Sequence, residues 1–352
     1  MADKRSRPTR HALLAIVIFG LSVAAGIVSV STAAFRGDRD SSVSQVKQGR
    51  DKPISSVFIP EGSREGLRIS DLCFWHNELF VSYRESDRIE VYDAALRLLR
   101  RFALRDGAHA SITAVAADAD ALYATDFASD EILFVNPRTG NVKQVFGFLP
   151  DGVTRIHPYA VTIHGDMLYV TDVVLHAVLA ISAKELPALR ELGEVVLRIP
   201  QRANDRALRF PTFTHVTADG RLLICDLAAG HIGVYSCSGR FIENFSVPGE
   251  RMAPMGIGQD TFKIPAFQMR KDSIFDPSGT LDQGRIHVVD ASTGCIRVFD
   301  PYGVYQGAYA HELVSPSGLA MDAKHERVFV ADPGLGGIAV FSITSPPTGG
   351  MP

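Results

Sequence analysis

Cysteine is scarce in this sequence, and neither sign of charge predominates, which removes several classes of site. The four cysteines form no Cys-x-x-Cys pair, no haem-attachment motif and no zinc-ligand spacing, and their oxidation state stays open because three pairings are possible. The 36 basic residues balance 39 acidic ones, leaving a net charge of −3 and no nucleic-acid footprint. A Gly-x-Ser-x-Gly nucleophile elbow is also absent. We therefore predict no cofactor, no metal and no nucleic-acid partner.

Long apolar runs are also rare, and the one clear case is residues 12–34, which carry no charge. A helix of 23 residues is about 34 Å long at about 1.5 Å per residue, enough to cross the hydrocarbon core of a membrane. Four basic residues in segment 1–11 precede it, so the positive-inside tendency places that segment in the cytoplasm. We expect a single-pass signal anchor in the inner or plasma membrane, with the rest of the chain outside, in the periplasm or extracellular space.

A cleaved signal peptide is the alternative to an anchor, because small residues around Ala33 and Ala34 suit cleavage. In either case residues 35–54 have almost no apolar content and are predicted to form a flexible tether. The last nine residues, 344–352, are predicted to be a disordered tail.

Six paired apolar runs occupy most of the remaining chain. The first run of each pair ends at an anchor residue, and the second begins with Ile or Val six residues later. The runs are rich in branched and aromatic residues, and the residues between them suit tight turns, so each pair predicts a β-hairpin. The anchors are Tyr83, Asp126, Asp172, Asp226, Asp290 and Asp332.

The anchors are 42 to 64 residues apart, close to the length of one four-stranded propeller blade, about 40 to 50 residues. Six anchors therefore predict an all-β, six-bladed β-propeller over residues 55–343. Blades one to five have a candidate outer strand after the hairpin, whereas the sixth has none. We predict that an N-terminal strand at residues 55–60 completes the sixth blade and removes two open sheet edges.

The sixth unit carries a resemblance to a known repeat. Pro316, Gly318, Leu319, Ala320 and Asp322 stand before its hairpin, and the whole unit resembles an NHL repeat. The first unit departs most, with Tyr83 where the others have Asp, and the fifth is stretched by an insertion. The resemblance implies a six-bladed propeller. It implies little about function, since NHL-type propellers include protein-binding modules, metal-dependent lyases and hydrolases.

Catalytic candidates are sought at the channel mouth, where the starts of the innermost strands converge. We predict that the innermost strands of blades one and two start at Ile69 and Ile112 and that those of blades three to six each start at a proline. In blade five this proline is Pro265. Only Asp71 and His157 are evident candidates there, with His215 and His109 as weaker ones. This is a poor ligand set for a metal. A histidine in a strand is more often a packing residue than a ligand.

Two loops between blades favour binding rather than catalysis. They are predicted to emerge on the face that opens at the channel mouth, where Arg68 also lies, and to gather basic and apolar residues. Arginine, methionine and aromatic residues are enriched in interface cores, although ordinary solvated loops would also account for them. The candidate contact residues are Arg202, Arg206, Arg209, Arg251, Met252, Met255, Phe262 and Lys263.

Two functions follow from these observations. The first is a membrane-anchored, extracytoplasmic binding or scaffold propeller whose face around blades three to five binds a protein with an acidic patch. The second is a metal-dependent lyase or lactone hydrolase with its site at the channel mouth. The weak catalytic constellation favours the first.

The anchor predicts where the protein fractionates. If residues 12–34 remain attached, the mature chain should begin near Met1 and stay in membranes through a carbonate wash. Immunoblotting of washed membranes together with N-terminal sequencing tests this. A mature N-terminus at Ala34 or Phe35 in the soluble exported fraction would show a signal peptide instead.

Overall fold

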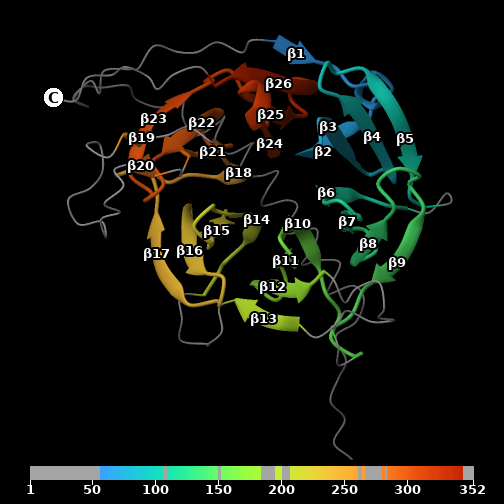
Figure 1. Ribbon diagram of the computed structural model, residues 1–352, viewed down its shortest axis with the longest axis horizontal. Helices are drawn as coiled ribbons and strands as arrows, with labels where there is room; N and C mark the ends of the chain where they lie inside the picture. Colours follow the sequence, from blue (N-terminus) through green and yellow to red (C-terminus); the bar gives the residue numbers. More distant parts are fainter. Residues whose placement is uncertain are drawn as a thin grey trace, which may run out of the picture. The chain divides into compact units, whose positions relative to one another are not determined.

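The structure, a computed structural model, describes residues 56–105, 109–149, 152–183, 195–199, 207–260, 264–265, 280–281 and 284–343. Six four-stranded antiparallel sheets stand around a central channel (Figure 1). Each innermost strand contacts the innermost strands of both neighbouring blades, including the pair formed by the last and the first blade. The predicted all-β, six-bladed propeller is confirmed.

The first three blades follow chain order from the channel outward. Their strands are β2 (Arg68–Trp75), β3 (Glu78–Arg84), β4 (Arg88–Asp93) and β5 (Leu98–Ala103); β6 (Ile112–Ala117), β7 (Leu122–Asp126), β8 (Glu131–Val135) and β9 (Val142–Phe146); and β10 (Pro158–His164), β11 (Met167–Asp172), β12 (Ala177–Ser182) and β13 (Val195–Ile199).

The last three blades follow the same order, apart from an insertion and the ring closure. Their strands are β14 (Pro211–Val216), β15 (Arg221–Asp226), β16 (His231–Ser236) and β17 (Phe241–Phe245); β18 (Pro254–Gln259), β21 (Ile286–Asp290), β22 (Cys295–Phe299) and β23 (Tyr305–Tyr309); and β24 (Gly318–Asp322), β25 (Arg327–Asp332), β26 (Gly337–Ser342) and β1 (Ser56–Phe58). The described elements also include two short helices, α2 (Glu61–Arg64) and η3 (Ala323–His325).

The register of the hairpins explains the constant offset of six residues in the sequence. In blade two, for example, Asp126 pairs with Glu131 and Thr125 with Ile132. The second strands of blades two to six are almost wholly buried, because both faces of each sheet pack against neighbouring blades. This burial accounts for their continuous apolar runs, where half-exposed strands would alternate.

The ring closes as the sequence predicts. The N-terminal strand β1 pairs antiparallel with β26, through Ser56 with Val340 and Phe58 with Ile338. The sixth blade is therefore built from both ends of the propeller chain, and β26 has no open edge. In Figure 1 the blue β1 lies beside the red β26.

Blade one replaces the anchor aspartate with a buried network around Glu90. Both Tyr83 and Tyr92 donate their hydroxyls to Glu90 Oε2, at 2.5 and 2.6 Å. The same carboxylate oxygen accepts the backbone N–H of Gly62 at 3.1 Å, and the Tyr92 hydroxyl accepts that of Glu61. The network therefore holds the start of α2, which follows the closing strand, against blade one.

The prediction for blade five is wrong at its innermost strand. That strand is β18, which begins at Pro254 rather than at Pro265. Residues 264–265 instead form β19, which pairs with β20 (Thr280–Leu281) in a separate two-stranded sheet. The insertion thus lies inside the blade, between its first and second strands. Pro254 and Pro265 both suit a strand start in the sequence, and the earlier of the two begins the strand.

The predicted segments 1–11, 12–34, 35–54 and 344–352 lie outside the described residues. Within the described part of the chain, no helix is long and apolar enough to cross a membrane. The anchor therefore stays a prediction.

The closure predicts a difference between two truncations. Removing residues 1–50 keeps β1 and α2, whereas removing residues 1–62 exposes the edge of β26 and takes away the Gly62 N–H that binds Glu90. We expect the longer deletion to lower the melting temperature by several degrees and to promote aggregation. Thermal scans and gel filtration of both proteins measure this. Equal stability and solubility would contradict the role of the N-terminal strand.

Candidate functional site

The two faces of the propeller carry different loops. Because the strands alternate in direction, connections between blades and turns between second and third strands emerge together on one face, which we call the mouth face. Connections between first and second strands, and between third and fourth strands, emerge on the opposite face. Arg209 and Arg251 precede innermost strands and so belong to the mouth face.

The innermost strands begin with β-bulges in blades one to five. In three of them a single residue is skipped in the pairing with the second strand, namely Thr113, Tyr159 and Met255. A bulge leaves its residue out of the ladder and re-aims the side chain. The bulges thus place selected side chains beside the channel, near its mouth.

Tyr159 lies across the central channel. Its ring meets Phe127 of blade two at 6.3 Å between centroids, and Phe210 and Phe213 of blade four at 6.0 Å each. Burial raises the pKa of Tyr159, while the Arg84 guanidinium of blade one opposes the rise by charge and hydrogen bonding. Blades one and three are not neighbours in the ring, so the interaction between Tyr159 and Arg84 places both side chains at the channel.

Asp71 of β2 joins this cluster from blade one. Its Oδ2 accepts the backbone N–H of Val115 at 3.1 Å, and its charge acts on Tyr159. Gly318 of blade six leaves room for it, since a Cβ there would lie 2.5 Å from Asp71 Oδ1. Burial raises the pKa of Asp71 to about 7, although backbone hydrogen bonds from Leu72 and Val115 oppose the rise. The channel therefore holds a carboxyl that changes charge near neutral pH.

The second catalytic candidate, His157, belongs to a different contact. Its Nε2 lies 3.8 Å from Asp130 Oδ2, across the junction of blades two and three. Its backbone N–H binds the anchor carboxylate of Asp172 at 2.8 Å. No contact between His157 and Asp71 occurs in the described part of the chain, so the structure does not assemble them into one site.

The other histidines do not form a metal site either. His215 in β14 is half-buried, and desolvation followed by the charge of His164 lowers its pKa to about 4, which keeps it neutral at pH 7. His109 is exposed. Among the residues that the structure describes, no three His, Cys, Asp or Glu side chains lie close enough to hold a metal ion. All four cysteines are free thiols.

The candidate binding residues other than Met252 separate into three groups. Arg68, Arg209 and Arg251 are exposed, and Arg68 pairs with Glu85 at 3.0 Å. Met255 is half-buried in β18. The remaining candidates Arg202, Arg206, Phe262 and Lys263 lie outside the described residues. Phe262 and Lys263 follow the end of β18, whereas Arg251 precedes its start, so one inter-blade loop does not carry all three.

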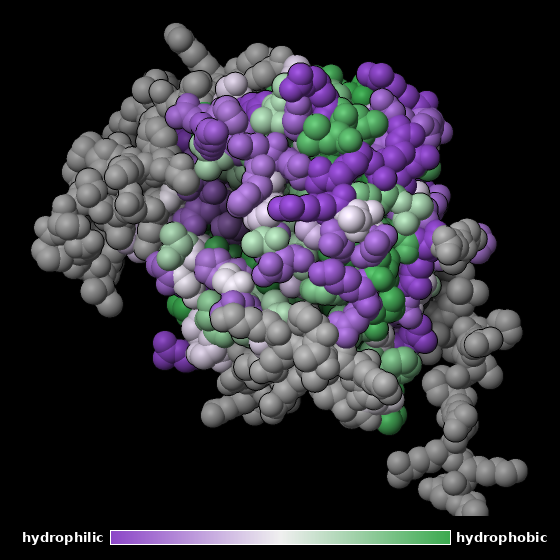
Figure 2. All heavy atoms as spheres, turned by 45° about the vertical axis from the view of Figure 1, so that its right-hand side comes forward, coloured by the Kyte–Doolittle hydropathy of each residue, from purple (hydrophilic) through white to green (hydrophobic). Residues whose placement is uncertain are grey.

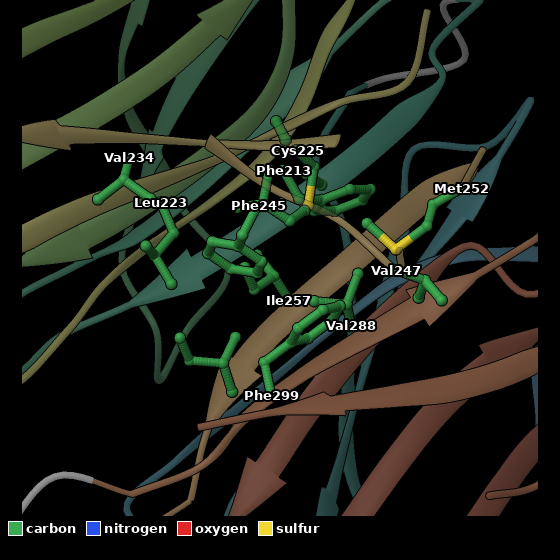
Figure 3. Packing of buried hydrophobic residues seen from close by; sticks show 14 residues of the cluster. Phe213, Leu223, Cys225, Val234, Phe245, Val247, Met252, Ile257, Val288 and Phe299 are labelled. Atoms are coloured by element: carbon green, nitrogen blue, oxygen red, sulfur yellow. The ribbon is translucent and has the colours of Figure 1, made fainter. Parts of the chain in front are cut away.

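Met252 is not a surface residue. Its side chain is 2% exposed and packs in the core between blades four and five, where Figure 3 shows it beside Val247. The expectation that Met252 contributes to docking is therefore wrong. Its apolar side chain is buried in this core, close to the start of β18, which begins two residues later.

A row of exposed arginines repeats along the mouth face. Arg155, Arg198 and Arg251 each donate from Nη2 to a carbonyl in the hairpin turn of blades two, three and four, at 2.6, 3.0 and 2.6 Å. We call these three residues, together with Arg209, the basic arc. Arg155 also lies 3.3 Å from Asp130. The arc links blades two to four, where the sequence placed its docking face at blades three to five.

The sides of the ring show fewer features of a binding surface than the mouth face does. Hydrophilic side chains predominate on the side shown in Figure 2, which brings blades one and two forward, and apolar atoms appear there as scattered patches. The exposed apolar residues of the outer strands include Leu99, Val145 and Ile242. Scattered exposed apolar side chains are normal for a soluble domain.

Comparison with solved structures supports the fold. A catalytically inactive variant of virginiamycin B lyase from Staphylococcus aureus, solved with quinupristin, is 12% identical with a TM-score of 0.55, covering 82% of this chain and 88% of that one. A streptogramin B lyase is 13% identical, with a TM-score of 0.53 and coverage of 77% and 92%. The Cps50 (Swd1) propeller domain of Myceliophteria thermophila is 10% identical, with a TM-score of 0.54 and coverage of 83% and 99%.

At such identities the likeness shows the propeller fold alone. No family model matches the chain, and no curated protein matches it. The membership of the NHL-repeat family therefore stays a prediction.

Sequence reasoning missed Arg84 and Tyr159, although both leave a signal. The residue after each anchor is apolar in blades two to six, and only blade one has a charged residue there. Tyr159 stands where the other bulged strands have Ser70, Thr113, Thr212 or Met255. An outlier within aligned repeats would have marked both.

The raised pKa of Asp71 predicts a pH dependence of stability. An acid whose pKa rises on folding binds its proton more tightly in the folded state, so its penalty is absent below about pH 4 and complete above about pH 7. We expect wild type to lose up to a few kcal/mol relative to Asp71→Asn across this window, at about 1.4 kcal/mol per pKa unit. Denaturant unfolding of both proteins at several pH values measures the difference. A difference that does not change with pH would contradict the assignment.

Proposed function

We propose that this propeller is a binding module that recognises a partner protein with an acidic patch through the basic arc. The supporting observation is the repetition of exposed arginines on one face, in consecutive blades. In the described part of the chain, no carboxylate pairs with Arg209 or Arg251. Both are therefore available to an acidic partner.

The carbonyl contacts favour binding by this arc. A free arginine side chain loses rotamer entropy when it is fixed in an interface, and that loss weakens association. One guanidinium nitrogen of Arg251 is already held by the Ala228 carbonyl, while the residue stays exposed. Val174, 45% exposed in the blade-three turn, supplies an apolar contact in place of Met252.

The cellular setting belongs to the same proposal. An NHL-type propeller held outside the inner or plasma membrane by residues 12–34 would present its mouth face to extracytoplasmic partners. The support for this is the charge distribution of the N-terminal sequence.

An enzyme acting at the channel mouth is the second candidate, favoured by Asp71. A carboxyl with a pKa of about 7, beside a phenol and a guanidinium, suits general acid–base chemistry at neutral pH. This observation names no substrate. The two candidates use different residues, so mutation separates them.

The docking proposal predicts the effect of charge reversal. The double variant Arg209→Glu and Arg251→Glu should weaken partner binding about tenfold or more, mainly through slower association, and the wild-type interaction should weaken as salt rises. The melting temperature should change little, because exposed charges contribute little to folding. Surface plasmon resonance at two salt concentrations, with a partner captured from membranes and identified, measures this.

A matched control lies on the opposite face. Arg138 and Arg240 are exposed residues of turns between third and fourth strands, so reversing both changes the net charge equally. We expect this control to bind like wild type at physiological salt. Equal weakening by the two double variants would show a net-charge effect and contradict recognition by the arc. Loss of a catalytic activity in Asp71→Asn would favour the second candidate.

A further inference from the structure

Arg84 differs from the other buried and half-buried arginines of the described chain, because it has no carboxylate partner. It is half-buried at the end of β3, its Nε is buried without a hydrogen-bond acceptor, and no carboxylate lies within ion-pair distance in the described part of the chain. Every other buried or half-buried arginine described has a carboxylate partner. These pairs involve Arg88, Arg100, Arg105, Arg221, Arg285, Arg297 and Arg327.

The nearby acid does not neutralise Arg84. Asp71 acts on the same Tyr159 hydroxyl, yet its own oxygens face the Val115 N–H and the backbone of Gly318. A guanidinium carries five N–H donors and is always charged. Holding it partly desolvated without an anion is unfavourable, and an unmade bond at a buried donor costs about 1 to 3 kcal/mol. An anion bound at this position would supply the missing acceptor.

The surroundings select the kind of anion. Tyr159 adds a hydroxyl donor beside Arg84, and the half-buried rings of Phe127 and Phe210 flank Tyr159. Aromatic faces and edges favour a flat apolar group. A neighbouring carboxyl disfavours a second negative charge, which weighs against phosphate dianions. A carboxylate fits the planar fork of a guanidinium through two parallel hydrogen bonds.

We propose that the channel mouth of this propeller binds a small aryl carboxylic acid, with its carboxylate on Arg84 and Tyr159 and its ring against Phe127 and Phe210. The site lies within the channel and uses none of the residues of the basic arc. A test of this site therefore does not depend on whether an acidic protein docks on the basic arc.

The test uses the full-length chain in detergent and 4-fluorophenylacetate as the probe. Fluorine NMR line broadening and titration should show saturable binding of this probe. Its neutral counterpart, 4-fluorophenylacetamide, should bind at least about tenfold more weakly, since it lacks the charge-assisted bonds. Inorganic phosphate should not compete.

Two variants assign the binding to the proposed groups. Arg84→Met keeps the apolar stem and removes the charge, and we expect it to weaken probe binding about tenfold or more. Tyr159→Phe removes only the hydroxyl, and a loss of about threefold to tenfold is expected. Arg97→Met is the matched control, because Arg97 is an exposed arginine of the same blade that pairs with Asp93 at 2.7 Å and lies in the turn between its third and fourth strands. It should bind like wild type.

Several results would overturn the proposal. They are no saturable binding of the acid at millimolar concentration, equal binding of the acid and the amide, or unchanged affinity in both Arg84→Met and Tyr159→Phe. If Arg84→Met does not fold, as judged by its thermal transition, the Tyr159→Phe affinity and the acid-to-amide ratio decide. Probe binding that survives the double reversal of Arg209 and Arg251 is expected, since the arc is a different site.

Discussion

The buried carboxylate at the end of the second strand is the interaction on which this propeller depends. In blades two to six an aspartate with 0 to 1% exposure accepts backbone N–H groups from two segments at once. Asp332, for example, binds the N–H groups of Val314 and Ser315 in the connection from blade five and those of Gly334 and Leu335 in its own turn. Removing such a group would leave several buried donors unpaired. The carboxylate thus ties each hairpin to the connection that enters its blade, and so shapes the mouth face.

This constraint explains how much the sequence predicts and where it stops. The second strand and its anchor recur along the chain because each of these strands is buried and the residue at its end makes buried hydrogen bonds. The blades and the closing strand could therefore be recognised without a structure. The innermost strands contain bulges and begin with different residues, and no comparable hydrogen-bonding requirement fixes the residue type at their starts. The sequence therefore does not distinguish Pro265 from Pro254, where the strand starts, and it does not show that Met252 lies in the core.

The candidate site was harder to predict for the same reason. Asp71 was identified from its position near a strand start, but its neighbours Arg84 and Tyr159 come from blades one and three and meet only because the ring closes. Residues of different blades are far apart in the sequence and form no local motif that would indicate their contact. The basic arc was found in part, as Arg209 and Arg251, because loops between blades are long enough to be noticed. Arg155 and Arg198 were missed because their equivalence depends on turn carbonyls, which no side-chain pattern reveals.

The first blade links these features, because it alone lacks the anchor aspartate. Glu90, held by two tyrosines, takes over that role and binds the backbone of α2, so the segment following the closing strand substitutes for a connection between blades. In blade one the carboxylate belongs to the third strand, and the residue after the anchor position is Arg84, where the other blades have an apolar residue. The half-buried guanidinium there has no carboxylate partner among the described residues, unlike the other half-buried and buried arginines. The blade that closes the ring is thus also the blade in which, among the described residues, a half-buried arginine lacks a carboxylate partner, and an anion bound there would gain charge-assisted hydrogen bonds.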